Sequence, residues 1–371
     1  MQGEAILKNE EKAVFALRSI YRQFGYLPYK MGKFEEYDFY VRNKDFLISD
    51  SVITFNDTNG KLMALKPDVT LSIIKNYKDE PGIVNRVYYN ENVYRVSEST
   101  HAYKEIMQTG LECFGEIGIQ NKLEVLHLAI ESLVAISDNF VLEVSHMGIL
   151  SGLLAKASAG VEFNSAITTC VGEKNAHEIP RICREYGVSD DVCEKLVKFV
   201  GIYGNKDKVL SELAEICEGE EMNAALEELR IISLALNNSP YSDKVIFDFS
   251  IVSSMKYYNG IVFRGFISGI PESVLSGGQY DKLMKKMGRN GGAIGFAVYL
   301  DLLETLTRKR NTYDVDVVLL YDDNDNMGRL IGAVMGLNAE GKTVSLQKQK
   351  PENISYKELM KLTDEGVETV G

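Results

Sequence analysis

The chain has 371 residues, which is enough for two or three domains and a substantial buried core. Its hydrophobic content of 45% and charged content of 25% are ordinary for a soluble globular protein. No stretch approaches the ~20 apolar residues that a membrane span needs, and the first residues carry neither a basic head nor an apolar signal core. We therefore expect a cytoplasmic protein without membrane contact.

The charges and the metal-binding residue types exclude further classes. With 41 basic and 53 acidic residues the net charge is −12, which argues mildly against an RNA partner because Lys and Arg supply most of the affinity for phosphates. The five cysteines never form a C-x-x-C pair, and the four histidines show no H-x-x-x-H spacing. We expect reduced thiols, with neither a disulfide nor a metal site.

The first part of the chain predicts a sheet with helices. Residues 10–24 have apolar side chains at helical spacing, which predicts a helix. The Asn59-Gly60 pair predicts a hairpin between short strands at 52–55 and 61–65. The next expected elements are strands at 86–96 and 105–115, a helix at 121–136 and a strand at 139–145. Neighbouring strands of this kind favour an antiparallel sheet covered by helices on one face.

The pattern then changes twice. Residues 147–240 are rich in Ala, Glu, Leu and Lys at helical spacing, which predicts a helical insertion. Strand character returns at 245–250, Asn259-Gly260 predicts a second hairpin that joins MKYY to IVFRGF, and GRNGGAIGFAVYLDLLETL predicts a strand followed by a helix. From about Tyr313 a small α/β unit is expected, with SYKELMKLTDEG as its second helix. The predicted domains are a core of residues 1–146 and 241–312, the insertion of residues 147–240, and a C-terminal unit of residues 313–371.

The strand EIMQTGLECFG has an unusual polar face. Because a strand alternates its faces, Gln108, Gly110 and Glu112 share one side, while apolar residues take the other. A glycine within a strand often marks the close approach of a ligand or of another backbone segment. The polar side is either a ligand pocket or a solvent-exposed surface, and this strand alone does not decide between them.

Other residues have the chemistry to complete such a pocket. Asp68 and Thr70 stand at the start of a predicted helix, where simple capping by Asp68 is the alternative role. Arg95 ends a strand and has the planar guanidinium that binds carboxylate or phosphate, unless it is an ordinary surface arginine. Three tyrosines lie beside turns, where each alone fits the core as well as a pocket: Tyr257, Tyr258 and Tyr280.

The order of these segments along the chain is specific. LKPDVT, NVYR, EIMQTGLECFG, YYNG, SGGQYDKL and GAIGFAVYLDLL follow one another as in the catalytic core of histidyl-tRNA synthetase. The chain resembles that family over roughly residues 5–310, with a helical insertion at the same place. The resemblance implies an α+β fold of the class II aminoacyl-tRNA synthetase type, with an antiparallel sheet flanked by helices.

The resemblance also implies roles for the pocket residues. The family positions matched by Asp68, Thr70 and Gln108 hold the α-amino group of histidine, although the family has a glutamate where this chain has Asp68. The positions matched by Glu112 and Tyr258 hold the imidazole. These roles fit the chemistry, because an ammonium group seeks carboxylate and amide oxygens. The implied histidine-binding residues are Asp68, Thr70, Arg95, Gln108, Glu112, Tyr257, Tyr258 and Tyr280.

The chain departs from the family where phosphate would be bound. Arg95 keeps the position that binds the α-phosphate and carboxylate, but the loop VSESTHAYK after it lacks the arginines that hold ATP and the tRNA end. Ser253 replaces the arginine of the family sequence R-G-L-D-Y-Y, and Leu302 replaces that of G-L-E-R-L. Lys256 lies near the first of these, but a point charge does not replace a bidentate guanidinium. Each lost cation removes roughly 10²–10³ in rate from phosphate chemistry.

A histidine pocket without the adenylation arginines is similar to the family of ATP phosphoribosyltransferase regulatory subunits. That resemblance implies a homodimer with no catalytic residue, metal or cofactor, which binds L-histidine and joins a short-form catalytic subunit in a hetero-oligomer. It would activate that subunit in the first step of histidine biosynthesis and mediate feedback by histidine, without tRNA.

Two alternatives remain at this stage. A divergent histidyl-tRNA synthetase is disfavoured by the lost arginines, the acidic charge and a C-terminal unit of only about 60 residues. A synthetase paralogue that charges a substrate other than tRNA would still need the arginines that bind ATP.

Overall fold

The computed structural model describes residues 7–47, 52–78, 80–97, 100–252, 257–307, 313–323, 325–363 and 366–370. Contacts divide the chain into two compact units, Met1–Leu306 and Thr307–Gly371. The first unit contains the predicted core and the helical insertion; the finer domain boundaries stay a prediction. Within the described residues, no helix is both long and apolar enough to cross a membrane.

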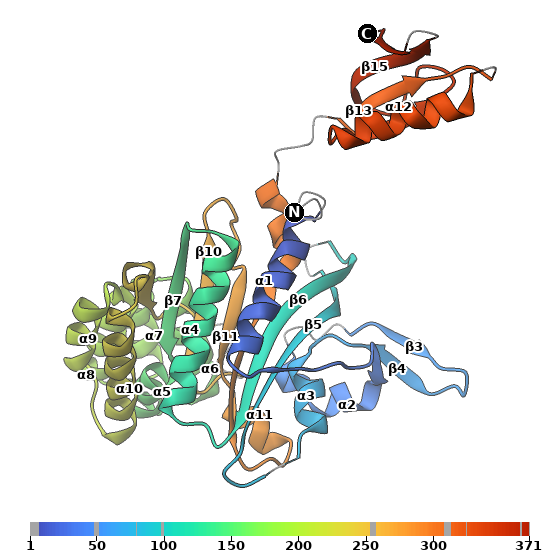
Figure 1. Cartoon of the computed structure of the whole chain (residues 1–371). Coiled ribbons are helices and arrows are strands. Elements are labelled where there is room, and N and C mark those ends of the chain that lie inside the picture. The colour runs from blue at the N-terminus through green and yellow to red at the C-terminus, as the bar shows by residue number, and fades with distance from the viewer. Residues whose placement is uncertain are drawn as a thin grey trace. The chain divides into compact units, whose positions relative to one another are not determined.

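A nine-stranded sheet forms the centre of the first unit (Figure 1). Its neighbouring strands pair antiparallel except for β1 with β5 and β7 with β9, which are parallel. This confirms the expected, largely antiparallel sheet. In sheet order the strands are β1 (Leu27–Pro28), β5 (Val84–Val96), β6 (Tyr103–Gly115), β12 (Gly292–Tyr299), β11 (Leu275–Gln279), β10 (Ile261–Ile267), β7 (Phe140–His146), β9 (Val245–Asp248) and β8 (Tyr203–Gly204).

One face of this sheet is the apolar core. Helices α1 (Asn9–Gln23) and α4 (Ile119–Ile136) cover it, as Figure 1 shows. The apolar stripe of α1 packs there through Leu17 and Tyr21, both fully buried, against Leu111 and Cys113 of β6 and other core residues. The strand alternation of EIMQTGLECFG therefore has its expected result, because its apolar side packs in the core and its polar side faces away from these helices.

A smaller three-stranded antiparallel sheet borders β5. It consists of β2 (Phe34–Glu36), β4 (Leu62–Leu65) and β3 (Thr54–Asn56). The hairpin predicted at Asn59-Gly60 is confirmed, and Gly60 adopts φ +79°, a left-handed conformation that suits glycine. Beside it lie α2 (Tyr37–Arg42), the 3₁₀ helix η1 (Lys44–Phe46) and α3 (Thr70–Asn76), which share a second apolar cluster.

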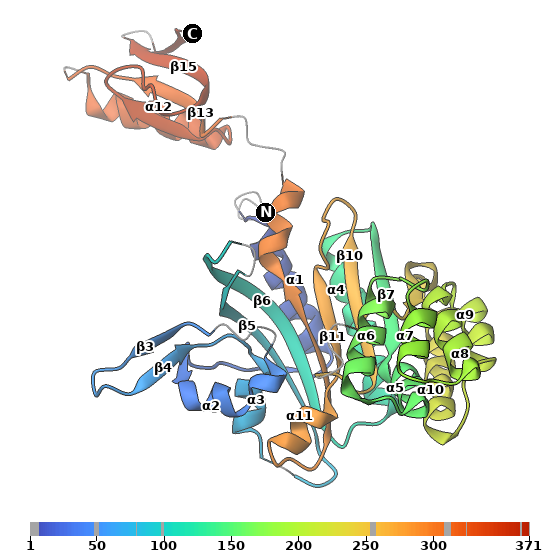
Figure 2. The same cartoon turned by 180° about the vertical axis from the view of Figure 1, so that it is seen from behind.

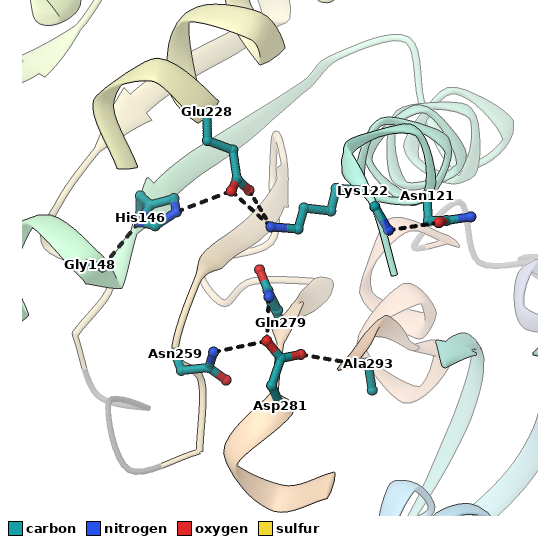
Figure 3. Close-up of polar contacts among 10 residues, drawn as sticks. Asn121, Lys122, His146, Gly148, Glu228, Asn259, Gln279, Asp281 and Ala293 are labelled. Carbon is teal, nitrogen blue, oxygen red and sulfur yellow. Dashed lines mark hydrogen bonds and ion pairs between the residues drawn. The ribbon is translucent and has the colours of Figure 1, made fainter. Parts of the chain in front are cut away.

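The insertion is helical, as predicted. Its helices are α5 (Met147–Ala157), α6 (Gly160–Gly172), α7 (Ile179–Glu185), α8 (Asp190–Gly201), α9 (Lys206–Ala214) and α10 (Glu220–Asn237), followed by the 3₁₀ helix η2 (Ser242–Lys244). Its apolar residues are continuous with the main core. In Figure 3 the carboxylate of Glu228 on α10 binds Lys122 Nζ of α4 through both oxygens at 2.8 Å and lies 3.8 Å from Nε2 of His146. This network ties the insertion to the sheet.

The second predicted hairpin is wrong. Residues 253–256 lie outside the described residues, and neither Tyr257 nor Tyr258 is part of a strand. Strand β10 instead pairs with β7 on one edge and β11 on the other, so neither edge is open to a hairpin partner. The Asn259-Gly260 turn leads into β10, and α11 (Asp281–Lys286) follows β11. The strand expected in the Gly-rich segment is β12, and the helix after it is the 3₁₀ helix η3 (Leu300–Thr307).

The second unit is a small α/β structure with its own core. Its four-stranded sheet has the order β14 (Val344–Gln347), β13 (Val315–Leu320), β15 (Tyr356–Thr363) and β16 (Gly366–Thr369), and α12 (Met327–Ala339) packs on it. The helix predicted for SYKELMKLTDEG is wrong, because this segment forms β15. It pairs parallel with β13 and antiparallel with β16, and Met360 and Leu362 pack with Val317 and Leu319.

Candidate functional site

A cavity of about 1230 Å³ lies on the polar side of the large sheet. Its floor comes from β5, β6, β10, β11 and β12, and its walls come from α3, α5, α6 and the turn before β10. Figure 2 shows this side of the molecule, with α6 over the β10 end of the sheet and α3 beside β5. Every residue that the sequence predicts for the pocket lines this one cavity: Asp68, Thr70, Arg95, Gln108, Glu112, Tyr257, Tyr258 and Tyr280.

The register of the sheet explains this convergence. Gly110 lies opposite Tyr89 of β5 and Ala297 of β12, and the same row continues through Ser276 of β11 to Arg264 of β10. Residues opposite one another on neighbouring strands project from the same face. The polar side of EIMQTGLECFG is therefore a cavity floor rather than a solvent surface.

Glycines keep this floor low enough for polar side chains to lie on it. A Cβ atom on Gly110 would come within 2.5 Å of the Tyr89 hydroxyl, and one on Gly295 within 1.8 Å of Glu112 Oε2. The close approach that the strand glycine indicated is therefore made by backbone carbonyls and side chains of neighbouring strands. Any larger residue would displace the groups that form the floor.

Glu112 is the central polar group of the cavity and is only 2% exposed. Its Oε1 accepts a hydrogen bond from Thr70 Oγ1 at 2.7 Å, and its Oε2 accepts one from the Tyr280 hydroxyl at 2.5 Å. Burial raises the pKa of Glu112 to about 8, although both hydroxyl donors favour the ionised form. At neutral pH this carboxyl group is therefore mostly protonated.

Asp68 combines the two roles that its sequence position allows. Its Oδ1 accepts the backbone N–H of Leu71 at 2.9 Å in the first turn of α3, and its side chain also lines the cavity. Burial raises the pKa of Asp68, opposed by this hydrogen bond and by the charge of Arg95. Arg95 donates from Nε to the Pro67 carbonyl at 3.0 Å, which holds the guanidinium beside the start of α3.

The aromatic wall is fixed by a polar anchor. The ring of Tyr257 lies 4.7 Å from that of Tyr258 and 5.6 Å from that of Tyr280, centroid to centroid. The neighbouring Asn259 donates from Nδ2 to Asp281 Oδ2 at 3.2 Å, and Asp281 Oδ1 accepts the N–H of Ala293 at 2.9 Å (Figure 3). Asp281 thereby holds the turn against α11 and β12.

Sequence reasoning missed other lining residues. Tyr89, Arg264 and Tyr299 all line the cavity. Tyr89 has the same strand parity as Arg95, and Arg264 is a charged residue in the middle of the apolar strand IVFRGF. Both patterns were available in the sequence as signals of a polar face.

Of the two positions where the family has an arginine, the structure describes only one. Ser253 and Lys256 lie outside the described residues. Leu302 is absent from the described cavity lining and packs against the main apolar core. The described cations that line the cavity are Arg95, Arg264 and Lys282. The described residues contain no group of three His, Cys, Asp or Glu arranged for a metal ion, and all five cysteines are free thiols.

Comparison with known proteins identifies the family. The sequence model described as histidyl-tRNA synthetase matches residues 3–303. A protein from Oceanobacillus iheyensis named ATP phosphoribosyltransferase regulatory subunit is 28% identical over 286 residues, which cover 76% of this chain and 70% of that protein.

Solved structures have the same fold. An ATP phosphoribosyltransferase regulatory subunit/histidyl-tRNA synthetase from Bacillus halodurans superposes with a TM-score of 0.75 at 23% identity, covering 95% of this chain and 93% of the other. A chain of the ATP phosphoribosyl transferase complex from Thermotoga maritima gives a TM-score of 0.62 at 20% identity, covering 78% and 97%. This protein belongs to the histidyl-tRNA synthetase family and, within it, resembles the ATP phosphoribosyltransferase regulatory subunits.

Proposed function

We propose that this protein is a non-catalytic regulatory subunit of ATP phosphoribosyltransferase and that it binds L-histidine in the cavity of its first unit. It acts in the cytoplasm as a homodimer within a hetero-oligomer with the short-form catalytic subunit. It activates that subunit in the first step of histidine biosynthesis and conveys feedback by histidine. It uses no metal, cofactor or tRNA.

The main support for this proposal is that the cavity has groups that suit an amino acid, whereas two arginines that would bind ATP are replaced. Carboxyl and amide groups suited to an ammonium and an imidazole, those of Asp68, Gln108 and Glu112, are buried together in it. By contrast, Leu302 stands at a family arginine position and packs against the apolar core, and Ser253 stands at the other such position. Such a site suits binding of an amino acid better than its activation with ATP.

The names of the relatives support the same role. The Oceanobacillus relative is named a regulatory subunit, and the Thermotoga structure is a complex of ATP phosphoribosyl transferase. Feedback through this cavity requires that histidine bind one state of the assembly more tightly than another, because a ligand with equal affinity for both states shifts nothing.

The test is co-purification with a short-form catalytic subunit, followed by an assay of ATP condensation with phosphoribosyl pyrophosphate. We expect the complex to be active, the catalytic subunit alone to be nearly inactive, and histidine to inhibit the complex. Glu112→Gln should weaken this inhibition, whereas Glu116→Gln, an exposed change just beyond β6, should not.

Two results would overturn the regulatory role, and a third would overturn the location of the histidine site. Histidine-driven exchange of ATP with pyrophosphate would identify a divergent synthetase instead. Failure to associate with or activate the catalytic subunit would exclude the regulatory role. Unchanged inhibition in Glu112→Gln would move the histidine sensor to another site.

A further inference from the structure

The cavity extends beyond the amino-acid-binding groups. Its volume of about 1230 Å³ exceeds the range of roughly 300–1,000 Å³ that is usual for a drug-sized ligand, and free histidine is smaller than such a ligand. The additional lining comes from β10, β11, the end of β12 and the helices α5 and α6 of the insertion. We call this part the α6 end of the cavity.

Arg264 gives the α6 end a cation. It lies at the centre of β10 on the cavity face, beside Ser276 of β11. Next to it, the hydroxyl groups of Ser276 and Tyr299 are 2.8 Å apart and hydrogen-bonded. A guanidinium has five N–H donors in a planar fork, so it can satisfy a protein neighbour and still bind an anion with two parallel hydrogen bonds.

Helix α6 lines the same end with hydrogen-bond acceptors. Thr168 and Thr169 donate their hydroxyl protons to the carbonyls of Asn164 and Ser165, at 2.6 and 3.0 Å. The Thr169 hydroxyl oxygen is thereby oriented to accept. Asn164 lines the cavity beside these threonines, and its amide group can hydrogen-bond a ligand hydroxyl.

Donors on the sheet and acceptors on the helix define the chemistry of a ligand. It must carry an anionic group for Arg264 and hydroxyl groups for α6. We propose that the α6 end of the cavity binds a phosphorylated sugar, with the phosphate at Arg264 and the sugar hydroxyls at Asn164 and its neighbours on α6. This site is separate from the proposed histidine contacts and does not depend on them.

A purely structural role for Arg264 is the competing explanation. Glu143 of β7 lies opposite Arg264 in the sheet, and the pKa of Glu143 is raised by burial and by Asp248 but lowered by Lys174 and Arg264. The exposed Glu272 also lines the cavity and would not favour an anion. If Arg264 only neutralises the charge of these carboxylates, replacing it will change the stability of the protein but not its affinity for any ligand.

The experiment is titration calorimetry of the full chain with ribose 5-phosphate, ribose, inorganic phosphate and gluconate. We expect ribose 5-phosphate to bind most tightly, because only it has both the phosphate and the hydroxyl groups. Arg264→Met should weaken it at least about tenfold, the scale of one lost charge-assisted hydrogen bond. Lys285→Met, which removes an exposed cation of α11 outside the described cavity lining, should leave it unchanged.

A second variant tests the helix. Asn164→Leu should weaken ribose 5-phosphate but not inorganic phosphate, because it removes only the sugar contact. Arg264→Lys, which retains the charge, keeps the test valid if Arg264→Met does not fold, and it should bind more weakly than the wild type.

Several results would overturn the proposal. They are no binding of ribose 5-phosphate at millimolar concentration, equal binding of ribose, tighter binding of gluconate, and equal losses in Arg264→Met and Lys285→Met. Histidine titrated into the same samples separates the two proposals, because a chain that binds the sugar phosphate but not histidine would contradict only the proposed function.

Discussion

The protonation state of Glu112 follows from its surroundings. The carboxyl group is buried between the hydroxyls of Thr70 and Tyr280, and Asp68 is close enough to disfavour a second negative charge. Burial dominates over the two hydroxyl donors, so the pKa of Glu112 rises. A cationic ligand group in the cavity would favour the ionised form. The residue is therefore suited to respond to the charge of what binds beside it.

This pKa has a consequence for stability. Glu112 has an ordinary pKa of 4.5 in the unfolded chain and about 8 in the folded one, so the folded state binds more protons between these values. The stabilising contribution is complete below pH 4.5 and is lost as the pH rises through about 8. We expect the free energy of unfolding to fall with pH more steeply in the wild type than in Glu112→Gln, by up to about 1.4 kcal/mol per pH unit.

Urea unfolding of both proteins at several pH values between 5 and 8 measures this difference. The comparison isolates Glu112, because all other titrating groups are shared. Parallel pH profiles would show that this carboxyl group has an ordinary pKa in the folded chain.

The floor glycines give a second residue-scale prediction. Gly295→Ala places a Cβ atom 1.8 Å from Glu112 Oε2 and 2.4 Å from the Leu111 carbonyl, so the backbone must move. We expect a loss of about 1–3 kcal/mol in unfolding free energy and weaker histidine binding. Gly332→Ala in α12 is the control: apart from the adjoining backbone of the helix itself, an added Cβ there has no atom of the described residues within 4 Å, and alanine favours a helix interior. Both are measured by denaturant unfolding, and equal effects would contradict the steric argument.

The structure also shows how far sequence reasoning reaches at the residue scale. The pocket residues of β6 could be found because strand alternation is local and their order resembles a known family. The charge of Arg264 within an apolar strand was a local signal of a polar face, but its neighbours depend on β10 lying beside β11 and on α6 lining the same cavity. That neighbourhood is produced by segments far apart in the chain.

At the scale of elements, the two Asn-Gly pairs had different outcomes. Asn59-Gly60 turns between β3 and β4, which within the described part of the chain pair only with each other and with β2, so local turn chemistry decides. Asn259-Gly260 precedes a central strand whose two edges are taken by β7 and β11. Strand β15 shows the same principle, because Tyr356, Leu359 and Met360 also fit helical spacing, yet the segment satisfies the free edge of β13.

The link between insertion and sheet gives an element-scale prediction. Burial acts against the charge of Glu228, but hydrogen bonds from His146 and Lys122 hold its pKa below the ordinary value, so its stabilising effect is lost as the pH falls. Glu228→Gln replaces the carboxylate that binds Lys122 with a neutral amide. We expect the free energy of unfolding to fall by about 1–2 kcal/mol at neutral pH. The neighbouring exposed Glu227→Gln is the control. If thermal unfolding gives the same midpoint for both variants, the network contributes nothing.

At the scale of the whole molecule, the chain contains two units with separate apolar cores. Scanning calorimetry should therefore resolve two unfolding transitions. Leu319→Ala removes a fully buried side chain of the second unit, and Leu142→Ala one of the first. Each variant should lose about 2–5 kcal/mol of unfolding free energy in its own unit, and each should lower the midpoint temperature of a different transition. A single transition shifted by both variants would show that the units unfold together.

Strand β6 has one side in the apolar core and the other on the cavity floor. Consecutive positions along it therefore contribute alternately to folding and to ligand binding. An alanine scan from Gln108 to Cys113 should alternate in phenotype with a period of two. Alanine substitutions at Thr109, Leu111 and Cys113 should reduce the amount of folded protein in cells. Those at Gln108 and Glu112 should leave that amount normal but change the histidine concentration that inhibits the complex. If substitutions on both sides of the strand reduce the amount of folded protein equally, the strand contributes to folding only.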